Sequence, residues 1–448
     1  MRRRSIYGAL VFSVAICVAA DAQGDGYKVG AESIIGIGRA GAGGAAMAGD
    51  ASVNHTNPAG IISLAGREFV TGLTYIHPEV DFEPGSSTLF DGSALTGTDG
   101  GNAGTPALVP NMHIVIPVNK VLAAGFSITS QYGLVSDYHP NFIDRYELVN
   151  ASLFGVNFNP SIAWKLSESI SIGGGLNIAY GRQKLRQAID FGSVCAAALG
   201  GATCAAGFGL VPGQSDGLAR VRLDDWAMGF NLGVNFDISP STRVGLGYRS
   251  KLTFEGRGHA INEVPENALS FLAAAGAPTA FANSDASGKF YFPAHAEMSI
   301  SHDLNNRLTV GASLNWTDWS IVKETRIRFD NPTAATSVSA ANYRDSYRFG
   351  AGFEYAASER LTLRGGIAFQ KSPIRDEFRE PAVPDSDRII TAFGASYDLS
   401  DTVSLQTGYQ FHKLSDGPQD RVSATGSRSR GNYDVSAHFL AVGIRVKF

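Results

Sequence analysis

Apolar residues alternate with polar or small ones along most of the chain from residue 66 onward. At the C-terminus, one face of the alternation is wholly apolar and comprises Leu440, Val442, Ile444, Val446 and Phe448. The opposite face, from Phe439 to Lys447, carries small or charged residues at most positions. A period of two predicts extended strands with one apolar side. Fourteen such strands are expected, at 66–83, 108–118, 120–133, 147–166, 168–182, 220–237, 242–258, 290–303, 307–320, 342–356, 360–371, 386–398, 402–414 and 431–448.

The connections between these strands alternate between short and long. The long ones are expected at 84–107, 134–146, 183–219, 259–289, 321–341, 372–385 and 415–430. An even strand number, aromatic residues near strand ends and alternating loop lengths are typical of bacterial outer-membrane barrels, whose short turns face the periplasm. The pattern therefore predicts an all-β fold: a transmembrane antiparallel barrel spanning residues 66–448, with both chain ends in the periplasm.

The first 65 residues do not follow this pattern. Three arginines (residues 2–4), a short apolar run and the sequence Ala20-Asp21-Ala22 predict a signal peptide over 1–22, which implies export. Residues 23–65 are rich in Gly and Ala and poor in charge. Small residues let backbone pass close to other backbone. We therefore expect this stretch to form a plug, or hatch, inside the barrel.

Two of the long loops are unusually apolar for segments that should face water. One contains residues 195–212, and the other contains 267–281, which could form a short amphipathic helix with Phe271 and Leu272. These loops could form a hydrophobic capture surface, or they could pack on each other as a lid. The first loop also holds Cys195 and Cys204, which are expected to form a disulfide in an oxidising compartment.

The net charge of −4 gives no reason to expect a nucleic-acid partner. Neither metal nor cofactor is expected, because the nine histidines are scattered. Residues 36–41 fit G-x-G-x-x-G, but a dinucleotide site also needs a preceding strand, a following helix and a distant acid. Residues 213–217 fit G-x-S-x-G, yet they fall in a predicted loop and not at a strand-to-helix elbow.

Several arginines fall on the inward face of predicted strands, among them Arg249, Arg348, Arg364 and Arg388. A buried arginine could hold the anionic head of a ligand. Each could equally pair with a carboxylate of the plug or wall, such as Glu354 or Asp387.

Short blocks of the chain resemble those of the FadL/TodX family of outer-membrane transporters for hydrophobic compounds. These blocks occur in the same order as in the family, and the resemblance runs from residue 27 to 448. The blocks are Gly38-Arg39-Ala40, Asn57-Pro58-Ala59, residues 158–163, 247–250 and 316–320, and Pro384 to Arg388. Tyr27 matches an aromatic residue that the family carries near the mature N-terminus. The resemblance implies a fourteen-stranded barrel closed by an N-terminal hatch.

The resemblance further implies passive uptake of hydrophobic compounds, most of all long-chain fatty acids, by a protein that is not an enzyme. Loops 183–219 and 259–289 would capture the ligand, and the hatch with Tyr27, Arg39 and Asn57 to Ala59 would gate its release. A kink in the third strand, at Gly125 or Gly133, would let it leave sideways into the membrane. The expected partners are hydrophobic small molecules, outer-membrane lipid and lipopolysaccharide, and the protein is expected to be a monomer.

Three alternatives remain open from the sequence. Family members that resemble this chain also take up monoaromatic hydrocarbons, which need no cationic anchor. A general diffusion porin would need a wet and unplugged lumen. A lipid-modifying enzyme would need a nucleophile and base near the outer rim, and the sequence offers no such set.

Overall fold

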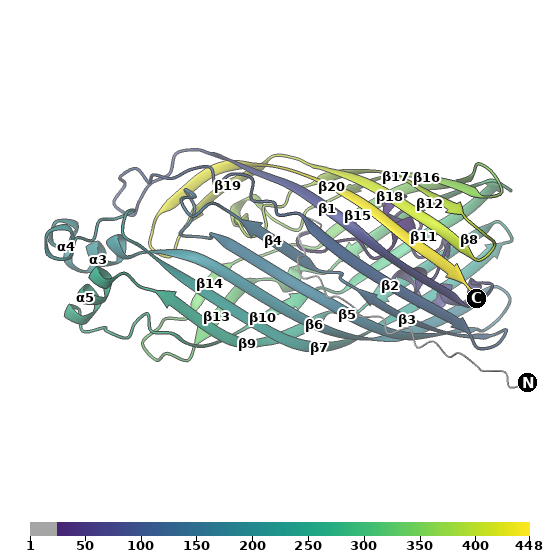
Figure 1. The fold of residues 1–448 in the computed structure, drawn as a ribbon, viewed down its shortest axis with the longest axis horizontal. Helices are drawn as coiled ribbons and strands as arrows, with labels where there is room; N and C mark the ends of the chain where they lie inside the picture. Colours follow the sequence, from purple (N-terminus) through teal and green to yellow (C-terminus); the bar gives the residue numbers. More distant parts are fainter. Residues whose placement is uncertain (1–24) are drawn as a thin grey trace, which may run out of the picture.

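The structure, a computed structural model, describes residues 25–448. The predicted signal peptide lies outside the described residues. One sheet of twenty strand segments contains every named strand. The last strand, β20 (Arg428–Lys447), pairs antiparallel with the first, β1 (Glu68–Pro84), so the sheet closes into a barrel (Figure 1).

Six pairs of consecutive segments continue one another around the barrel wall, which makes fourteen spans and confirms the predicted fold class. These pairs are β3–β4, β8–β9, β10–β11, β12–β13, β14–β15 and β18–β19. The strands between β1 and β20 are β2 (Ala107–Pro117), β3 (Leu122–Thr129), β4 (Gly133–Asp137), β5 (Asn150–Lys165), β6 (Ile170–Asp190), β7 (Asp216–Ser239), β8 (Thr242–Arg249), β9 (Leu252–Glu263), β10 (Ser284–Phe292), β11 (His295–Asn305), β12 (Leu308–Thr317), β13 (Glu324–Phe329), β14 (Ser337–Ala340), β15 (Ser346–Ala356), β16 (Leu361–Gln370), β17 (Arg388–Asp398), β18 (Val403–Leu414) and β19 (Gly417–Val422).

Burial follows the predicted alternation. On β20, Leu440 and Val442 are more than half exposed on the outer surface, whereas Phe439 and Ala441 are fully buried. Outward apolar residues can face lipid, and inward small residues leave room for chain inside the barrel.

Several strands run further than their apolar pattern predicted. β6 and β7 were expected to end at residue 182 and begin at residue 220, but they extend to Asp190 and from Asp216. The polar residues at 183–187 suggested a loop, yet each of them pairs across to β7. Above the hydrocarbon layer an outward face no longer has to be apolar, so a charged strand is stable there.

The N-terminal segment, defined here as residues 25–66, lies inside the barrel and is the purple chain in Figure 1. It contains two short helices, α1 (Ile34–Ile37) and α2 (Val53–Thr56), and a 3-10 turn, η1 (Pro58–Ser63). α1 contacts β17, β18 and β20, while η1 contacts β5, β6 and β7 on another part of the wall. The segment therefore bridges the lumen from side to side.

Three helices cap the barrel end opposite the C-terminus (Figure 1). They are α3 (Phe191–Leu199), α4 (Gly201–Phe208) and α5 (Glu266–Ala274), and α5 confirms the helix predicted in the second apolar loop. Two further 3-10 turns, η2 (Trp319–Ile321) and η3 (Asp376–Phe378), lie between strands. Within residues 25–448 no single helix is long and apolar enough to cross a membrane, and α3 and α4 qualify only together, as a pair bent by 117°.

Candidate functional site

A cavity of about 530 Å³ lies inside the barrel, between the N-terminal segment and the long-loop end. Its volume falls within the range of about 300–1,000 Å³ that is common for small-molecule sites. The apolar side chains lining it include Tyr27, Leu134, Leu148, Leu153, Leu185, Val221, Phe290, Val322, Ile327, Phe329, Val338, Tyr343 and Val383. Such a lining favours a hydrophobic ligand, because binding removes apolar surface of both partners from water.

Tyr27, which lines this cavity, belongs to a buried cluster of aromatic side chains. The Tyr27 ring packs edge-on against Trp319 with ring centroids 4.5 Å apart, and Tyr132 lies beside both. The Tyr27 hydroxyl donates a 2.9 Å hydrogen bond to the backbone carbonyl of Tyr291. Tyr27 thus ties the start of the N-terminal segment to the cavity wall.

The same stretch of backbone fills a break in the third span of the barrel. β3 ends at Thr129 and β4 begins at Gly133. Across the break, Val29 N–H donates to the carbonyl of Gln131 at 2.9 Å, and Gly133 N–H donates to the carbonyl of Tyr27 at 3.0 Å. The N-terminal segment therefore supplies the hydrogen-bond partners that a neighbouring strand would otherwise provide.

Above this break, the wall has an unpaired seam. β4 pairs with β5, and residues 107–111 of β2 pair with β1, but β2 and β4 do not pair with each other. The loop before β2 joins the two sides through isolated bridges from Gly104 to Ser136 and from Thr98 to Phe142. This seam lies where the resemblance places a lateral exit, and its position corrects one predicted residue. Gly125 lies inside paired β3, where an added Cβ would lie 2.6 Å from Oδ1 of Asn54, so it provides close contact with the N-terminal segment and not a break.

Among the polar side chains that line the cavity, one cation and two carboxylates lie together as a group. Arg421 Nη2 lies 3.4 Å from Glu147 Oε2 and donates to Ser339 Oγ at 3.1 Å, and that hydroxyl donates to Glu380 Oε2 at 3.4 Å. We refer to these four residues as the polar cluster. Burial raises the pKa of Glu147 to about 7, and it also raises the pKa of Glu380. The cluster can therefore change its net charge near neutral pH.

The inward arginines predicted from parity do not line this cavity. Arg249 donates to the backbone carbonyl of His55 at 2.8 Å, and Arg348 donates to the carbonyl of Ala40. Arg388 forms a fully buried ion pair with Asp385. All three contact other groups of the protein, Arg249 and Arg348 on the N-terminal segment, and a role in holding a ligand head stays a prediction.

The blocks that carried the resemblance instead anchor the N-terminal segment. Arg39 and Arg364 each lie 2.8 Å from Oε1 of Glu354, an ion pair with the wall carboxylate that the sequence offered as the alternative. Asn57 Nδ2 donates to the Ala45 carbonyl at 2.8 Å, while its Oδ1 accepts from Ala59 N–H at 3.0 Å. Pro58 begins η1 directly after this cap.

Glycines of the wall make this close packing possible. A Cβ added at Gly233 would lie 2.0 Å from Asn57 Oδ1, and one added at Gly173 would lie 2.4 Å from the nitrogen of Ala59. Both distances are too short for any side chain. The inward glycines of β6 and β7 therefore fit the Asn57-Pro58-Ala59 turn.

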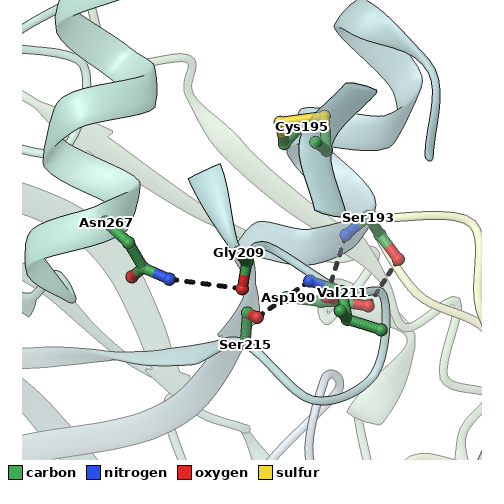
Figure 2. Close-up of a disulfide and its surroundings, with 8 residues drawn as sticks. Asp190, Ser193, Cys195, Gly209, Val211, Ser215 and Asn267 are labelled. Carbon is green, nitrogen blue, oxygen red and sulfur yellow. Dashed lines mark hydrogen bonds between the residues drawn. A yellow bond between two sulfur atoms is a disulfide. The ribbon is translucent and has the colours of Figure 1, made fainter. Parts of the chain in front are cut away.

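At the long-loop end, Cys195 and Cys204 form a disulfide that joins α3 to α4 (Figure 2). Asp190 caps α3 by accepting from Ser193 N–H at 2.9 Å, and Asn267 at the start of α5 donates to the Gly209 carbonyl at 3.5 Å (Figure 2). Phe271 and Leu272 are buried in the cluster that these helices share. They hold the helices together and are not themselves open to a ligand.

The outward surface of α3 to α5 remains apolar. Its exposed residues include Leu199 and Leu269 together with several alanines, and no charged residue occurs at 191–209 or 267–282. The sequence left open whether these loops form a capture surface or pack on each other as a lid, and each alternative fits a different side of the same helices. The inner sides pack together, and the outer sides leave apolar surface in water.

Sequence reasoning missed the polar cluster and the role of Trp319. Arg421 and Glu380 fall in stretches predicted as loops, where strand parity says nothing about direction. Trp319 belongs to the quoted block 316–320, but its packing on Tyr27 depends on a contact 292 positions away along the chain. Among residues 25–448, no group of three or more His, Cys, Asp or Glu side chains is arranged to hold a metal ion.

Comparison with known proteins places this geometry in a family. The family model described as outer membrane protein transport protein (OMPP1/FadL/TodX) matches residues 15–448. The chain is 28% identical over 446 residues to the long-chain fatty acid transport protein of Escherichia coli K12, covering 93% of this chain and 96% of that protein. It is 26% identical over 469 residues to outer membrane protein P1 of Haemophilus influenzae, covering 98% of each.

Solved structures share the fold. A FadL homologue of Pseudomonas aeruginosa superposes with a TM-score of 0.86 at 24% identity, covering 94% of this chain and all of that one. The toluene transporter TbuX of Ralstonia pickettii gives a TM-score of 0.65 at 20% identity, covering 94% of this chain and 99% of that one. With the family model matching nearly the whole sequence, the chain belongs to the OMPP1/FadL/TodX family of outer-membrane transport proteins.

Proposed function

We propose that the protein takes up long-chain fatty acids and similar amphiphiles across the outer membrane. The observation that carries this proposal is the 530 Å³ apolar cavity, closed at one end by Tyr27 and adjoining the unpaired seam between β2 and β4. A long apolar chain gains about 0.8 kcal/mol for each methylene it buries there. The 28% identity to a long-chain fatty acid transport protein supports the same substrate class.

The route would have four stages. The apolar outer surface of α3 to α5 collects the ligand from water, and the ligand then moves into the cavity. Its polar head lies at the polar cluster, where Arg421 can bind a carboxylate in place of Glu147. Movement of residues 25–29 away from the strand break then opens the seam, and the ligand leaves sideways into lipid without crossing a water-filled lumen.

In this proposal residues 25–66 act as the hatch. The body of the hatch is held by the buried Arg39–Glu354 ion pair and by the Asn57 turn. Its first residues are held by backbone hydrogen bonds to the edge of a broken strand. These bonds can be exchanged for others at modest net cost, so we expect the first residues to move while the body stays in place.

Uptake of monoaromatic hydrocarbons by the same route is the second candidate. It is favoured by the pairing of Arg421 with Glu147, which leaves the cavity without an uncommitted cation among the residues lining it. A general porin is disfavoured because the N-terminal segment fills the lumen, where a polar cavity beside it measures only about 100 Å³.

Equilibrium binding to the purified barrel in detergent tests the proposal. A fluorescent long-chain fatty acid is titrated and then displaced with palmitic acid, the alcohol of equal length, octanoic acid or toluene. We expect palmitic acid to compete far better than octanoic acid, since each methylene changes affinity about fourfold.

Competition by toluene and measurement of conductance distinguish fatty-acid uptake from hydrocarbon uptake and from a general porin. Equal displacement by toluene and by the long-chain compounds would favour the hydrocarbon route. Absence of binding together with high single-channel conductance would overturn the proposal in favour of a porin.

A further inference from the structure

The outer surface of β6 and β7 continues well beyond the apolar band. These strands have 21 and 24 residues, whereas about 9–11 residues are enough for a tilted strand to cross the hydrocarbon core. In the outward rows of these strands, Tyr180 on β6 and Trp226 on β7 are the last aromatic residues before a run of mostly charged positions. Aromatic residues of this kind mark the membrane–water interface, so the positions just beyond them lie at the level of lipid head groups.

Outward positions beyond this interface carry a group of cations, which we call the basic rim. It comprises Arg182, Lys184 and Arg186 on β6 and Arg220 and Arg222 on β7. Lys184 lies directly opposite Arg222, and Arg186 lies directly opposite Arg220. Like charges in cross-strand pairs destabilise a sheet unless an anion lies between them.

The protein itself neutralises the basic rim only in part. Arg220 pairs with Glu263 at 2.8 Å, and Arg222 makes a longer contact of 3.7 Å with Asp224. Among the described residues, Lys184 and Arg186 have no carboxylate within salt-bridge distance, although Lys184 is exposed on the surface. The Arg182 guanidinium lies 5.7 Å over the Phe154 ring.

The opposite side of the barrel differs. There Lys413 lies 2.5 Å from Asp434, and Arg428 and Arg430 lie 2.6 and 3.1 Å from the two oxygens of Asp420. These cations are about as exposed as Arg220 and Arg222 of the basic rim, but each of them lies within 3.1 Å of a carboxylate oxygen. The excess positive charge on β6 and β7 is therefore a local feature and not a property of the whole rim.

We propose that the basic rim binds the phosphate groups of a phosphorylated glycolipid of the outer leaflet, of the lipopolysaccharide type. Arginine and lysine side chains bind phosphate oxygens through charge-assisted hydrogen bonds. Directly below, Trp226 and Met228 are exposed on the lipid-facing surface, where they can contact the acyl chains of the same molecule. Cations above an apolar surface match the phosphates and acyl chains of a lipid, whereas a free anion would need only the cations.

The test uses the full-length barrel in detergent, freed of bound lipid and titrated with purified lipopolysaccharide. A variant carrying Lys184→Gln, Arg186→Gln and Arg222→Gln is compared with a control carrying Lys413→Gln, Arg428→Gln and Arg430→Gln. A single Lys184→Gln variant, which alters one exposed side chain, guards against misfolding of the triple variant. Lipid A with and without its phosphates and inorganic phosphate serve as further ligands.

We expect the basic-rim variant to bind lipopolysaccharide on the order of a hundredfold more weakly and the single variant several-fold more weakly, because each cation near an anionic lipid surface contributes to binding. The control should bind as the parent does, and millimolar inorganic phosphate should not compete. Unchanged affinity in the basic-rim variant, an equal loss in the control, or equal binding of phosphate-free lipid A would each overturn the proposal.

Discussion

At the scale of single residues, the proposed function assigns recognition of the ligand head group to the polar cluster. Arg421 already contacts Glu147, and both side chains are close to 90% buried, at 12% and 13% exposure. A ligand carboxylate must compete with Glu147 for the same guanidinium. This competition depends on whether Glu147 is charged. Because burial raises the pKa of Glu147 to about 7, its charge changes near neutral pH.

The affinity for a fatty acid is expected to depend on pH through Glu147. Because the pKa of Glu147 is raised to about 7, this side chain is neutral below that pH and leaves Arg421 to the ligand. Fatty acids in free solution are ionised throughout the range tested, so their affinity should fall as pH rises from 6 to 8, by at most about tenfold per unit above 7. Glu147→Gln should bind more tightly at pH 8 and lose this dependence.

Glu324→Gln is the matched control for this experiment. Glu324 lines the same cavity but pairs with Arg326 at 2.7 Å and does not contact Arg421. It should keep the pH profile of the parent. A profile that is flat in the parent, or one that survives Glu147→Gln, would remove the polar cluster from head-group recognition. Binding of the fatty alcohol, measured in parallel, should not vary with pH.

At the scale of elements, we propose that the break between β3 and β4 and the backbone that fills it form a gate. Residues 27–29 bond to both sides of the break, whereas Asn54 bonds to Ser127 below it at 2.8 Å. In the proposed function the first contact opens for lateral release, and the second belongs to the part of the N-terminal segment that stays in place.

A disulfide across each contact separates these roles. Lys28 and Tyr132 are antiparallel bridge partners, at a spacing that suits a disulfide. Lys28→Cys with Tyr132→Cys should bind fatty acid but lose uptake into cells when oxidised, and it should recover uptake on reduction. Asn54→Cys with Ser127→Cys should transport in both states, and the single-cysteine variants should not respond to reductant. Full uptake by the oxidised Lys28→Cys, Tyr132→Cys variant would show that the first residues of the hatch need not move.

The sequence predicted the fourteen-span barrel well, but it predicted the contacts around Tyr27 only in part. Strand parity is a local property, so the fourteen spans and the alternation along β20 followed directly from it. Strand parity failed at residues 183–187, where polar side chains beyond the membrane suggested a loop although β6 continues through them. It could not reveal that Tyr27 meets Trp319, since that contact joins distant segments. The inward arginines were found by parity, but parity does not report depth, and they lie beside the hatch.

At the scale of the whole molecule, the N-terminal segment closes the lumen, and one side of the wall has a seam where β2 and β4 do not pair. The N-terminal segment bridges the wall from β5 to β20 and blocks passage along the axis. The seam between β2 and β4 begins beside the apolar cavity. In the proposed function, a hydrophobic compound that enters from the long-loop end would therefore leave through this seam into lipid and not along the axis into the periplasm.

A long-chain ligand is expected to occupy the cavity beside Tyr27, where the neighbouring Trp319 serves as a fluorescence probe. A variant with Trp164, Trp226 and Trp316 each replaced by Phe keeps Trp319 as its single tryptophan. Titration with a fatty acid brominated near its chain end should quench Trp319 fluorescence saturably, because bromine quenches only at short range. Adding Ala151→Phe, which narrows the cavity, should abolish the quenching. Absence of saturable quenching, or quenching that is unchanged by Ala151→Phe, would contradict the account.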